Sequence, residues 1–247
     1  MLAIIGTWHL IVQCFAIPPY FLPRPQTVFE TLIADRDVLF PALSRTAVNT
    51  LCALGLSALA GVVVAILVAS SRILELFVSP VLICLQVTPI VALAPLILVY
   101  APSEKSAQLF CAFLVSFFPI FANTLRGLKS IDRDQYDMVS LYTGSRLTIM
   151  RVLQIPSALP GFFAGLKISG GLALVGTIVA EFTAGSAGPE AGLAFRLIEA
   201  QYRLNMPRLF AAIVLLALLG SAVIGALAFA DRIVLRHWHA MTKQLSP

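Results

Sequence analysis

Six long runs of the sequence contain almost no charged residue. Counting Asp, Glu, Lys and Arg as interruptions, five runs are uncharged and a sixth is broken only by Lys167; in order they are 1–23, 46–71, 76–103, 106–125, 152–180 and 209–230. A helix needs about 20 apolar residues to cross the hydrocarbon core of a bilayer, and each run reaches that length. The sequence therefore predicts an all-α integral membrane protein, a single domain over 1–247 with six transmembrane helices at about 1–20, 46–69, 76–100, 106–125, 158–180 and 209–231.

The composition supports this class and narrows the partners. Hydrophobic residues make up 59% of the 247 and charged residues only 12%, whereas soluble domains carry about 25% charged residues. Basic loops on the cytoplasmic side of a membrane account for the net charge of +5, so we expect no nucleic-acid partner. Six spans would place both termini on the same side of the membrane. The four cysteines have no paired spacing and no accompanying histidines, so no metal site is expected.

A polar stretch, 132–160, interrupts the apolar runs and has the pattern of two short amphipathic helices. Asp132 is a suitable N-cap for the first helix, and Thr143, Gly144 and Ser145 break the pattern with small side chains. The second helix begins at about Arg146. We expect it to end at Pro156, because proline lacks an amide donor and restricts the residue before it.

This stretch resembles the cytoplasmic coupling loop of the inner-membrane permease subunits of bacterial ATP-binding-cassette importers. That loop carries Glu-Ala-Ala, a glycine six residues after the Glu, and a later pair of a hydrophobic residue and proline. Counting back from Ile155 and Pro156, the Glu-Ala-Ala positions are occupied by Asp137, Met138 and Val139, and the glycine position by Thr143, followed by Gly144 and Ser145. The resemblance implies a type I importer permease fold, a coupling loop over 126–157, and contact of these residues with an ATPase.

Two further stretches are similar to the nitrate, sulfonate and taurine branch of these permeases. One is Leu22-Pro23-Arg24-Pro25, followed by a short amphipathic segment before the second span. The other is Thr88-Pro89, followed by Leu93-Ala94-Pro95 inside the third span. The resemblance implies a small anionic nutrient such as nitrate, a sulfonate or taurine as the solute. Thiamine-precursor pyrimidines and riboflavin, carried by related permeases, are the alternatives.

Five residues at membrane depth are candidates for the translocation path. Pro89 and Pro95 free backbone carbonyls and bend the third span, which a bilayer tolerates only where protein or a water-filled cavity satisfies those groups. Gln86 and Thr88 then either line a passage or hydrogen-bond between helices. Ionisable residues in spans are functional candidates; Lys167 is placed to extend toward the inner surface, and Glu181 to meet water at the outer mouth. The candidates are Gln86, Thr88, Pro89, Lys167 and Glu181.

Glycines crowd the start and middle of the fifth span. Gly161 and Gly165 are four residues apart, and Gly170, Gly171 and Gly176 follow. No strand precedes them and no Gly-Lys-Ser or Gly-Lys-Thr follows, so a phosphate-binding loop is not indicated. We expect a face of nearly bare backbone on which another helix packs closely.

The sequence lacks a Walker-type phosphate loop, so we expect no ATPase activity, catalytic residue or cofactor. The resemblance implies a non-enzymatic subunit of the bacterial inner membrane, with two copies of a cytoplasmic ATP-binding subunit, a second permease chain as a homodimer, and a periplasmic substrate-binding protein. A stand-alone secondary transporter is an alternative, but it would show inverted repeats and several buried charges. A membrane-embedded enzyme would need clustered acid–base or metal-binding groups at membrane depth. Neither pattern is visible.

Overall fold

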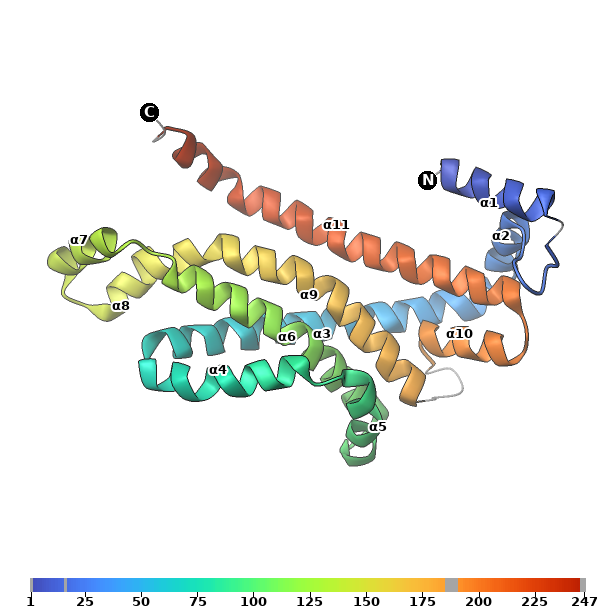
Figure 1. Ribbon diagram of the computed structural model, residues 1–247, viewed down its shortest axis with the longest axis horizontal. Coiled ribbons are helices and arrows are strands. Elements are labelled where there is room, and N and C mark those ends of the chain that lie inside the picture. Colours follow the sequence, from blue (N-terminus) through green and yellow to red (C-terminus); the bar gives the residue numbers. More distant parts are fainter. Residues whose placement is uncertain (1, 16, 185–190, 245–247) are drawn as a thin grey trace.

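The computed structural model describes residues 2–15, 17–184 and 191–244, and this part of the chain is helical throughout apart from its connections (Figure 1). The predicted all-α class is therefore confirmed. The elements are α1 (Leu2–Cys14), α2 (Pro25–Ala34), α3 (Arg36–Ser70), α4 (Arg72–Val87), α5 (Ile90–Tyr100), α6 (Glu104–Lys129), α7 (Arg133–Thr143), α8 (Arg146–Ile149), the π-helical turn η1 (Met150–Gln154), α9 (Ile155–Ala184), α10 (Leu193–Tyr202) and α11 (Met206–Gln244).

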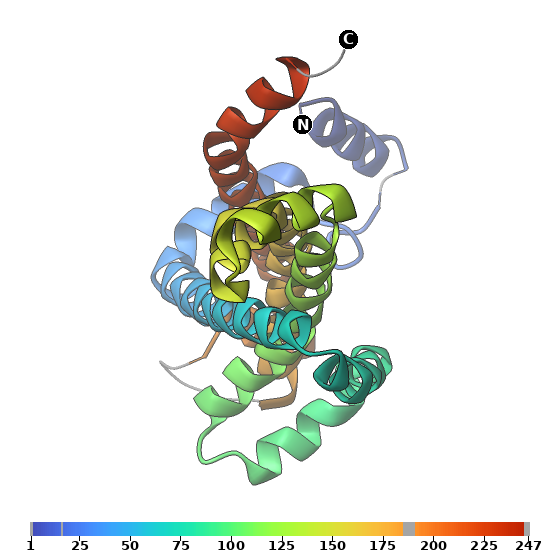
Figure 2. The same cartoon turned by 90° about the vertical axis from the view of Figure 1, so that its left-hand side faces the viewer.

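Four long helices, α3, α6, α9 and α11, form an elongated bundle with its axis horizontal in Figure 1. The short helices α7 and α8 lie at one end, which we name the α7 end, and α2 and α10 lie at the other, the α10 end. Viewed from the α7 end, the helices α4 and α5 stand to one side of the bundle (Figure 2). Within the bundle α6 is central, since it packs against both α3 and α9.

The helices α6 and α9 meet at their backbones. A Cβ added to Gly161 would lie 2.5 Å from the carbonyl oxygen of Asn123, and one added to Gly165 would lie 2.6 Å from that of Pro119. Farther along, a Cβ at Gly176 would lie 2.8 Å from the Cα of Ala112. Any side chain at these positions would push the helices apart, so the expected close-packing face is confirmed.

Hydroxyl groups join the three central helices. The hydroxyl oxygens of Ser57 on α3 and Ser116 on α6 lie 2.7 Å apart, and the Oγ of Ser169 on α9 donates to the carbonyl oxygen of Ser116 at 2.5 Å. Such hydrogen bonds hold helices together in lipid, where apolar side chains gain little by leaving the solvent. The centre of the bundle is therefore fixed by short, directional contacts as well as by packing.

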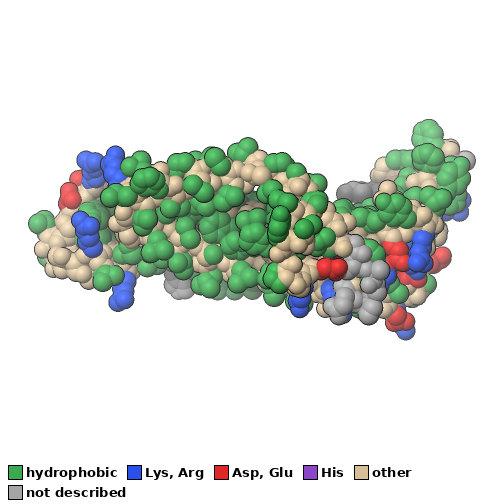
Figure 3. Space-filling view, turned by 90° about the horizontal axis from the view of Figure 1, so that it is seen from below, with side chains coloured by type: hydrophobic (Ala, Val, Ile, Leu, Met, Phe, Trp, Pro, Cys, Tyr) green, Lys and Arg blue, Asp and Glu red, His purple; other side chains and the backbone are tan. Residues whose placement is uncertain are grey.

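Charged side chains gather toward the two ends of the face seen in Figure 3, with an apolar stretch between them. Four helices of the described chain are long and apolar enough to cross a membrane: Arg36–Ser70, Glu104–Lys129, Arg146–Ala184 and Met206–Arg236. Helices α4 and α5 reach the same standard only as a pair, bent by 101° at their junction. The described chain thus offers four crossings, or five if the bent pair is one span.

The first predicted span differs from the structure. The helix α1 has 13 residues, about 20 Å of helix, against the roughly 30 Å of a hydrocarbon core. Its Trp8 ring lies 5.8 Å from the ring of Phe210, at the beginning of α11, so α1 lies at the α10 end. The run 1–23 is long in composition, but Pro18 and Pro19 fall inside it; Met1 and Ala16 lie outside the described residues.

The two ends of the described chain lie at different ends of the bundle. Because α1 and α2 lie at the α10 end and the C-terminal part of α11 reaches toward the α7 end (Figure 1), the helices α1 and α11 end on opposite sides of the bundle. Six spans would instead place both ends on one side, and the six-span arrangement stays a prediction. An even number of spans was assumed, whereas the described helices make at most five crossings.

Candidate functional site

The polar stretch folds as a helix, a tight turn and a second helix at the α7 end. Asp132 is the N-cap residue of α7 as expected, although its side chain makes no capping hydrogen bond. The helix ends where Gly144 adopts a left-handed conformation, with φ of 58°, and its amide donates to the carbonyl oxygen of Ser140 at 3.0 Å. Only glycine takes this conformation without strain, so Gly144 sets the turn between α7 and α8.

The helix after this turn does not end at Pro156, contrary to the sequence prediction. Instead α8, η1 and α9 follow one another without a gap from Arg146 to Ala184. The amide of Ile155 donates to the carbonyl oxygen of Met150, five residues back, which is the wider π-helical pattern. This wider turn directly precedes Pro156, where the missing amide and the bulky ring would disrupt an ordinary α-helical ladder.

The α7–α8 segment presents large apolar side chains to its surroundings. Leu141 and Tyr142 are each 87% exposed, and Met138, Leu147 and Val152 are also exposed. The helices α7 and α8 lie at one end of the molecule (Figure 1), and Figure 3 shows charged side chains at both ends of the face that it draws. Exposed apolar side chains that gather on a surface are typical of a site that contacts another protein or a membrane.

The predicted coupling residues fall into two groups. Asp137, Met138, Thr143 and Gly144 are exposed around the turn, with Val139 and Ser145 half-buried beside them. Ile155 and Pro156 lie at the beginning of α9; Ile155 is ten residues beyond Ser145, or about 15 Å along a helix. The residues around the turn are accessible to a partner, whereas Ile155 and Pro156 lie where the segment joins α9.

The break between α4 and α5 follows directly from Thr88-Pro89. Both residues have extended backbones, with ψ of 125° and 109°, so the helix axis turns there. A cavity of about 350 Å³, which we name the bend cavity, lies between this break and the helices α6 and α9. Its lining is apolar except for Gln86 and Thr88: Leu85, Gln86, Thr88, Ile90, Leu93, Leu114, Val115, Phe118, Pro119 and Leu172.

Gln86 and Thr88 therefore share one cavity, with Pro89 at its hinge. The hydroxyl of Thr88 donates to the carbonyl oxygen of Cys84 at 2.8 Å, within its own helix. Both side chains are exposed in the single chain, and α4 has no fully buried residue. The polar part of the cavity wall therefore lies on an exposed surface of this chain.

Lys167 lies apart from that cavity and is paired. Its Nζ lies 2.7 Å from Oδ2 of Asp231 on α11, with side-chain exposures of 38% and 18%. The sequence indicated a lone lysine extending toward the surface and did not identify Asp231 as its partner. Asp231 stands at the predicted end of the last span, where an acidic residue is expected to mark the boundary.

Glu181 also differs from its sequence prediction. It is 1% exposed, whereas an outer mouth filled with water was expected around it. The hydroxyl of Thr46 donates to both carboxylate oxygens, at 2.8 and 3.0 Å, and the amide of Ala194 donates to Oε2 at 3.0 Å. The sequence gives no sign that α3 encloses this group, because Thr46 is 135 residues from Glu181, whereas Ala194 is only 13 residues from it.

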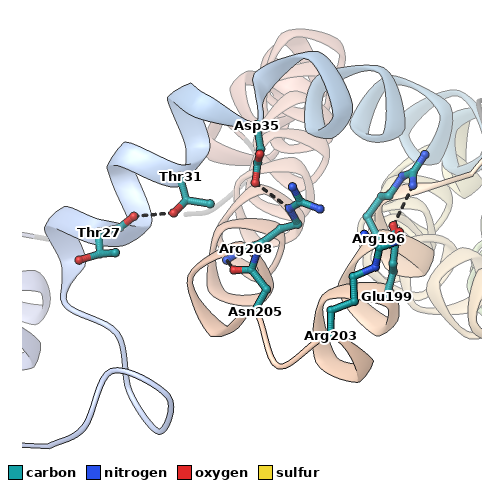
Figure 4. A network of polar contacts seen from close by, with 8 residues as sticks. All are labelled: Thr27, Thr31, Asp35, Arg196, Glu199, Arg203, Asn205 and Arg208. Atoms are coloured by element: carbon teal, nitrogen blue, oxygen red, sulfur yellow. Dashed lines mark hydrogen bonds and ion pairs between the residues drawn. The ribbon is translucent and has the colours of Figure 1, made fainter.

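Ion pairs connect the elements of the α10 end (Figure 4). Asp35, between α2 and α3, accepts a hydrogen bond from Nε of Arg208 at 2.6 Å, and Glu199 of α10 accepts one from Arg196 at 2.8 Å. The hydrogen bond from Arg196 holds the pKa of Glu199 below its ordinary value of 4.5; partial burial opposes this, and the charges of Arg196, Arg203 and Arg208 add to the lowering. The Asp35–Arg208 pair joins the beginning of α3 to the beginning of α11, whereas the Arg196–Glu199 pair lies within α10.

The sequence matches a family of known proteins and several of their members. A family described as "Binding-protein-dependent transport system inner membrane component" matches residues 57–235. The formylaminopyrimidine transport permease protein ThiX of Halalkalibacterium halodurans is 30% identical over 88% of this chain and 86% of its own length. A protein of Bacillus subtilis named for aliphatic sulfonates transport, the permease protein SsuC, is 26% identical over 88% of this chain and 78% of its own.

A solved structure shares the fold. A chain of the MetNI methionine ABC transporter, in a study of its inward-facing conformations, superposes with a TM-score of 0.67. The match covers 80% of this chain and 96% of that one, at 17% sequence identity. Most of the helical arrangement of this chain therefore also occurs in that chain.

Proposed function

The chain belongs to the family of binding-protein-dependent transport system inner membrane components, and on that premise we propose how its parts divide the work of transport. It is a permease subunit of an ATP-binding-cassette importer, with six expected and at most five observed spans. It is not an enzyme, and ATP hydrolysis lies in a separate subunit. The bend cavity is proposed as its share of the solute path, and the α7–α8 segment as the part that receives the ATPase.

The coupling role of the α7–α8 segment is supported by its exposed apolar surface. Leu141 and Tyr142 protrude almost fully from a helix at one end of the bundle. We assign the contact itself to Asp137, Met138, Val139, Thr143, Gly144 and Ser145. Ile155 and Pro156 act instead at the root, where the π-helical turn joins the segment to α9.

A push on this segment reaches deep into the bundle. Because α8, η1 and α9 form one helical rod, a displacement of the turn moves α9 along its whole length. Because α9 touches α6 through backbone at Gly161 and Gly165, α6 moves with it. Both helices line the bend cavity, through Leu172 on α9 and Leu114, Val115, Phe118 and Pro119 on α6. The cavity is therefore where the motion would act on a solute.

The proposed assembly has two permease chains, two ATP-binding subunits and one periplasmic binding protein in a bacterial inner membrane. The exposed polar wall of the bend cavity supports the second permease chain: Gln86, Thr88 and Pro89 are exposed on one chain and need a facing surface to enclose a solute. A second copy of the same chain is the simplest such surface, and it would double the path about a two-fold axis.

The lining of the bend cavity favours an uncharged solute. Among its lining residues the polar side chains are an amide and a hydroxyl, with neither lysine nor arginine. Gln86 can both donate and accept hydrogen bonds, and Phe118 offers a ring face, which suits a planar heterocycle. A thiamine-precursor pyrimidine fits this lining, and so does the flavin alternative. ThiX, at 30% identity, is named for such a pyrimidine.

A sulfonate or taurine solute is supported by a different observation. A second cavity, of about 440 Å³, opens between α3 and α6 at the α10 end, and Arg45 and Lys105 line it together with Glu104 and polar groups. An anion delivered from outside would meet these cations first. This cavity suits an entry point for the nitrate, sulfonate or taurine class.

Uptake competition separates the two solute classes. The full transporter, reconstituted with its binding protein, would take up radiolabelled formylaminopyrimidine or taurine in separate assays. The bend-cavity proposal expects uptake of the pyrimidine and its loss in Gln86→Leu, with Ile83→Ala on the same helix as the control. Uptake of taurine alone would reject the uncharged class and favour the anionic one. Uptake of neither, without ATP-dependent transport of any related solute, would reject the proposed path.

A further inference from the structure

The buried carboxylate of Glu181 lies in the last turn of α9, beneath the first turn of α10. Its partners come from two other elements: the hydroxyl of Thr46 on α3 and the amide of Ala194 on α10. The same hydroxyl accepts a hydrogen bond from the amide of Leu193 at 2.9 Å. Three helices therefore meet in one polar contact that is closed to solvent.

This contact replaces the missing cap of α10. The N-cap residue, Gly192, has no side chain with which to bind the free amides of the first turn. Glu181 and Thr46 bind the amides of Ala194 and Leu193 in its place. A Cβ at Gly192 would overlap the carboxylate of Glu181, so glycine is needed for the carboxylate to reach its position. A carboxylate is also the group that the positive end of a helix favours.

Glu181 and the coupling turn lie at the two ends of one rod. From Arg146 to Ala184 the helix is continuous over 39 residues, about 58 Å. The α7–α8 segment leads into one end of it, and Glu181 holds α10 at the other. The helix α10 stands at the end of the bundle opposite the α7–α8 segment (Figure 1). A movement of α10 can therefore reach that segment only along α9 or along the helices that pack on α9.

The contact is suited to transmit a movement because it has two distinct states. Apolar surfaces slide by small steps, but hydrogen bonds to a buried carboxylate are either made or lost, and a lost bond leaves a buried group unsatisfied. A tilt of α10 that withdraws the amides of Leu193 and Ala194 would therefore pull on α9 before the contact broke. The apolar cluster of Val28, Leu39, Leu193, Ala211 and Leu215 keeps α10 attached to α3 and α11 in either state.

We propose that Glu181, through its contact with Thr46 and the first turn of α10, is the positioning residue by which a binding protein docked on the α10 end signals to the ATPase at the α7 end. This inference rests on the proposed function. Docking would shift α10, the shift would pass through Glu181 into α9, and α9 would move the coupling turn. Glu181 is thus outside the solute path, because its partners within the protein leave it closed to solvent.

The test compares basal and stimulated ATPase activity of the reconstituted transporter. In Glu181→Gln the charge is lost and the amide group cannot accept from Thr46 with both of its ends. Thr46→Val keeps the shape of the side chain but removes its hydroxyl, and with it the contacts to the carboxylate of Glu181 and to the amide of Leu193. We expect assembly and basal ATPase activity to remain, and stimulation by the solute-loaded binding protein to fall about tenfold, within the range usual for coupling between sites. The solute is the one, formylaminopyrimidine or taurine, that stimulates the wild type.

Two variants serve as controls. Thr46→Ser keeps the hydroxyl and should keep the stimulation. Thr183→Val removes a hydroxyl that bonds only to carbonyl oxygens of its own helix, at Val179 and Ala180, and should have no effect. Hydrogen exchange gives a second measurement: the amides of Leu193 and Ala194 should exchange faster in Glu181→Gln, while those of α6 stay protected.

Normal stimulation in both Glu181→Gln and Thr46→Val, beside a stimulated wild type, would overturn this inference and leave the proposed function standing. Loss of basal activity and of assembly in both would overturn it as well, because the contact would then be needed only for folding. A wild-type complex that ignores its binding protein would instead overturn the proposed function, and this inference with it.

Discussion

Lys167 on α9 and Asp231 on α11 form an ion pair inside the bundle, with 2.7 Å between Nζ and Oδ2. This ion pair joins α9, which continues from the α7–α8 segment, to α11. Neither group would be stable alone at membrane depth, where an unpaired charge is costly. The pair therefore has consequences for stability that can be measured separately from transport.

Lys167→Met should lower the melting temperature of the detergent-solubilised protein, because it leaves Asp231 without its partner. The pair is partly exposed, so the loss should be about 1–2 kcal/mol, between the values for surface and buried pairs. The double variant Lys167→Met, Asp231→Leu should recover part of it, since both charges are then gone. A double variant whose loss equals the sum of the two single losses would show that the groups do not interact.

Tyr142→Glu should prevent the ATP-binding subunit from copurifying with the permease. The side chain is 87% exposed, so the change should leave the fold intact, within about 0.5 kcal/mol. Tyr202→Glu is the matched control, because Tyr202 is 85% exposed at the opposite end of the bundle. Mass spectrometry of tagged complexes from native membranes reads out both variants. Equal recovery of the subunit with the two variants would reject the α7–α8 docking surface.

Gly144→Ala should slow transport, because an alanine in the left-handed conformation costs about 1–2 kcal/mol and would reshape the turn. Gly144→Trp adds a large side chain to the α7–α8 turn, and Asp137→Arg reverses a charge beside it. Both variants should still insert into the membrane, but ATP hydrolysis should no longer drive transport. Gly55→Ala is the control, since no neighbouring atom lies within 4 Å of its Cβ position. Normal uptake rates in Gly144→Trp and Asp137→Arg would disprove the coupling assignment.

The helix α10 should loosen in acid. The hydrogen bond from Arg196 lowers the pKa of Glu199, so the ionised group stabilises the folded state at pH values above the ordinary 4.5. That stability is lost as the pH falls from this value through the lower pKa of the folded protein. Hydrogen exchange of α10 amides should show the change at low pH, and Glu199→Gln should remove the pH dependence over that window. Protection that is identical in both proteins at every pH would contradict this account.

Composition and spacing predicted the parts of the molecule that depend on local sequence. The apolar runs predicted the long helices, Gly144 and its neighbours the turn, and Gly161 and Gly165 the face on which α6 packs. Each of these follows from a few adjacent residues. One local prediction, the helix end at Pro156, was nevertheless wrong, and the first span stays a prediction that the described helix does not fill. The run 1–23 has the composition of a span, but α1 ends at Cys14. Pro156 has the chemistry of a helix breaker, but the π-helical turn before it lets the helix continue.

The pairings of the site could not be predicted, because they join residues far apart in the chain. Lys167 and Asp231 are 64 residues apart, and Thr46 and Glu181 are 135 apart. A single sequence shows that Glu181 is costly to bury, yet it does not show which helix will enclose it. The assignment of Gln86, Thr88 and Pro89 to a solute path also stays a prediction, since Gln86 and Thr88 share a cavity but nothing in the sequence or the structure shows a solute there.

The backbone contact between α6 and α9 limits how much of an applied force can be absorbed. Long side chains between two helices absorb small displacements, because their rotamers change before the main chains move. At Gly161 and Gly165 there are no such side chains, and the carbonyl oxygens of Asn123 and Pro119 lie directly against α9. A displacement of the α7–α8 segment should therefore pass from α9 to α6 with little loss of amplitude, and a methyl group at either glycine would force the two helices apart.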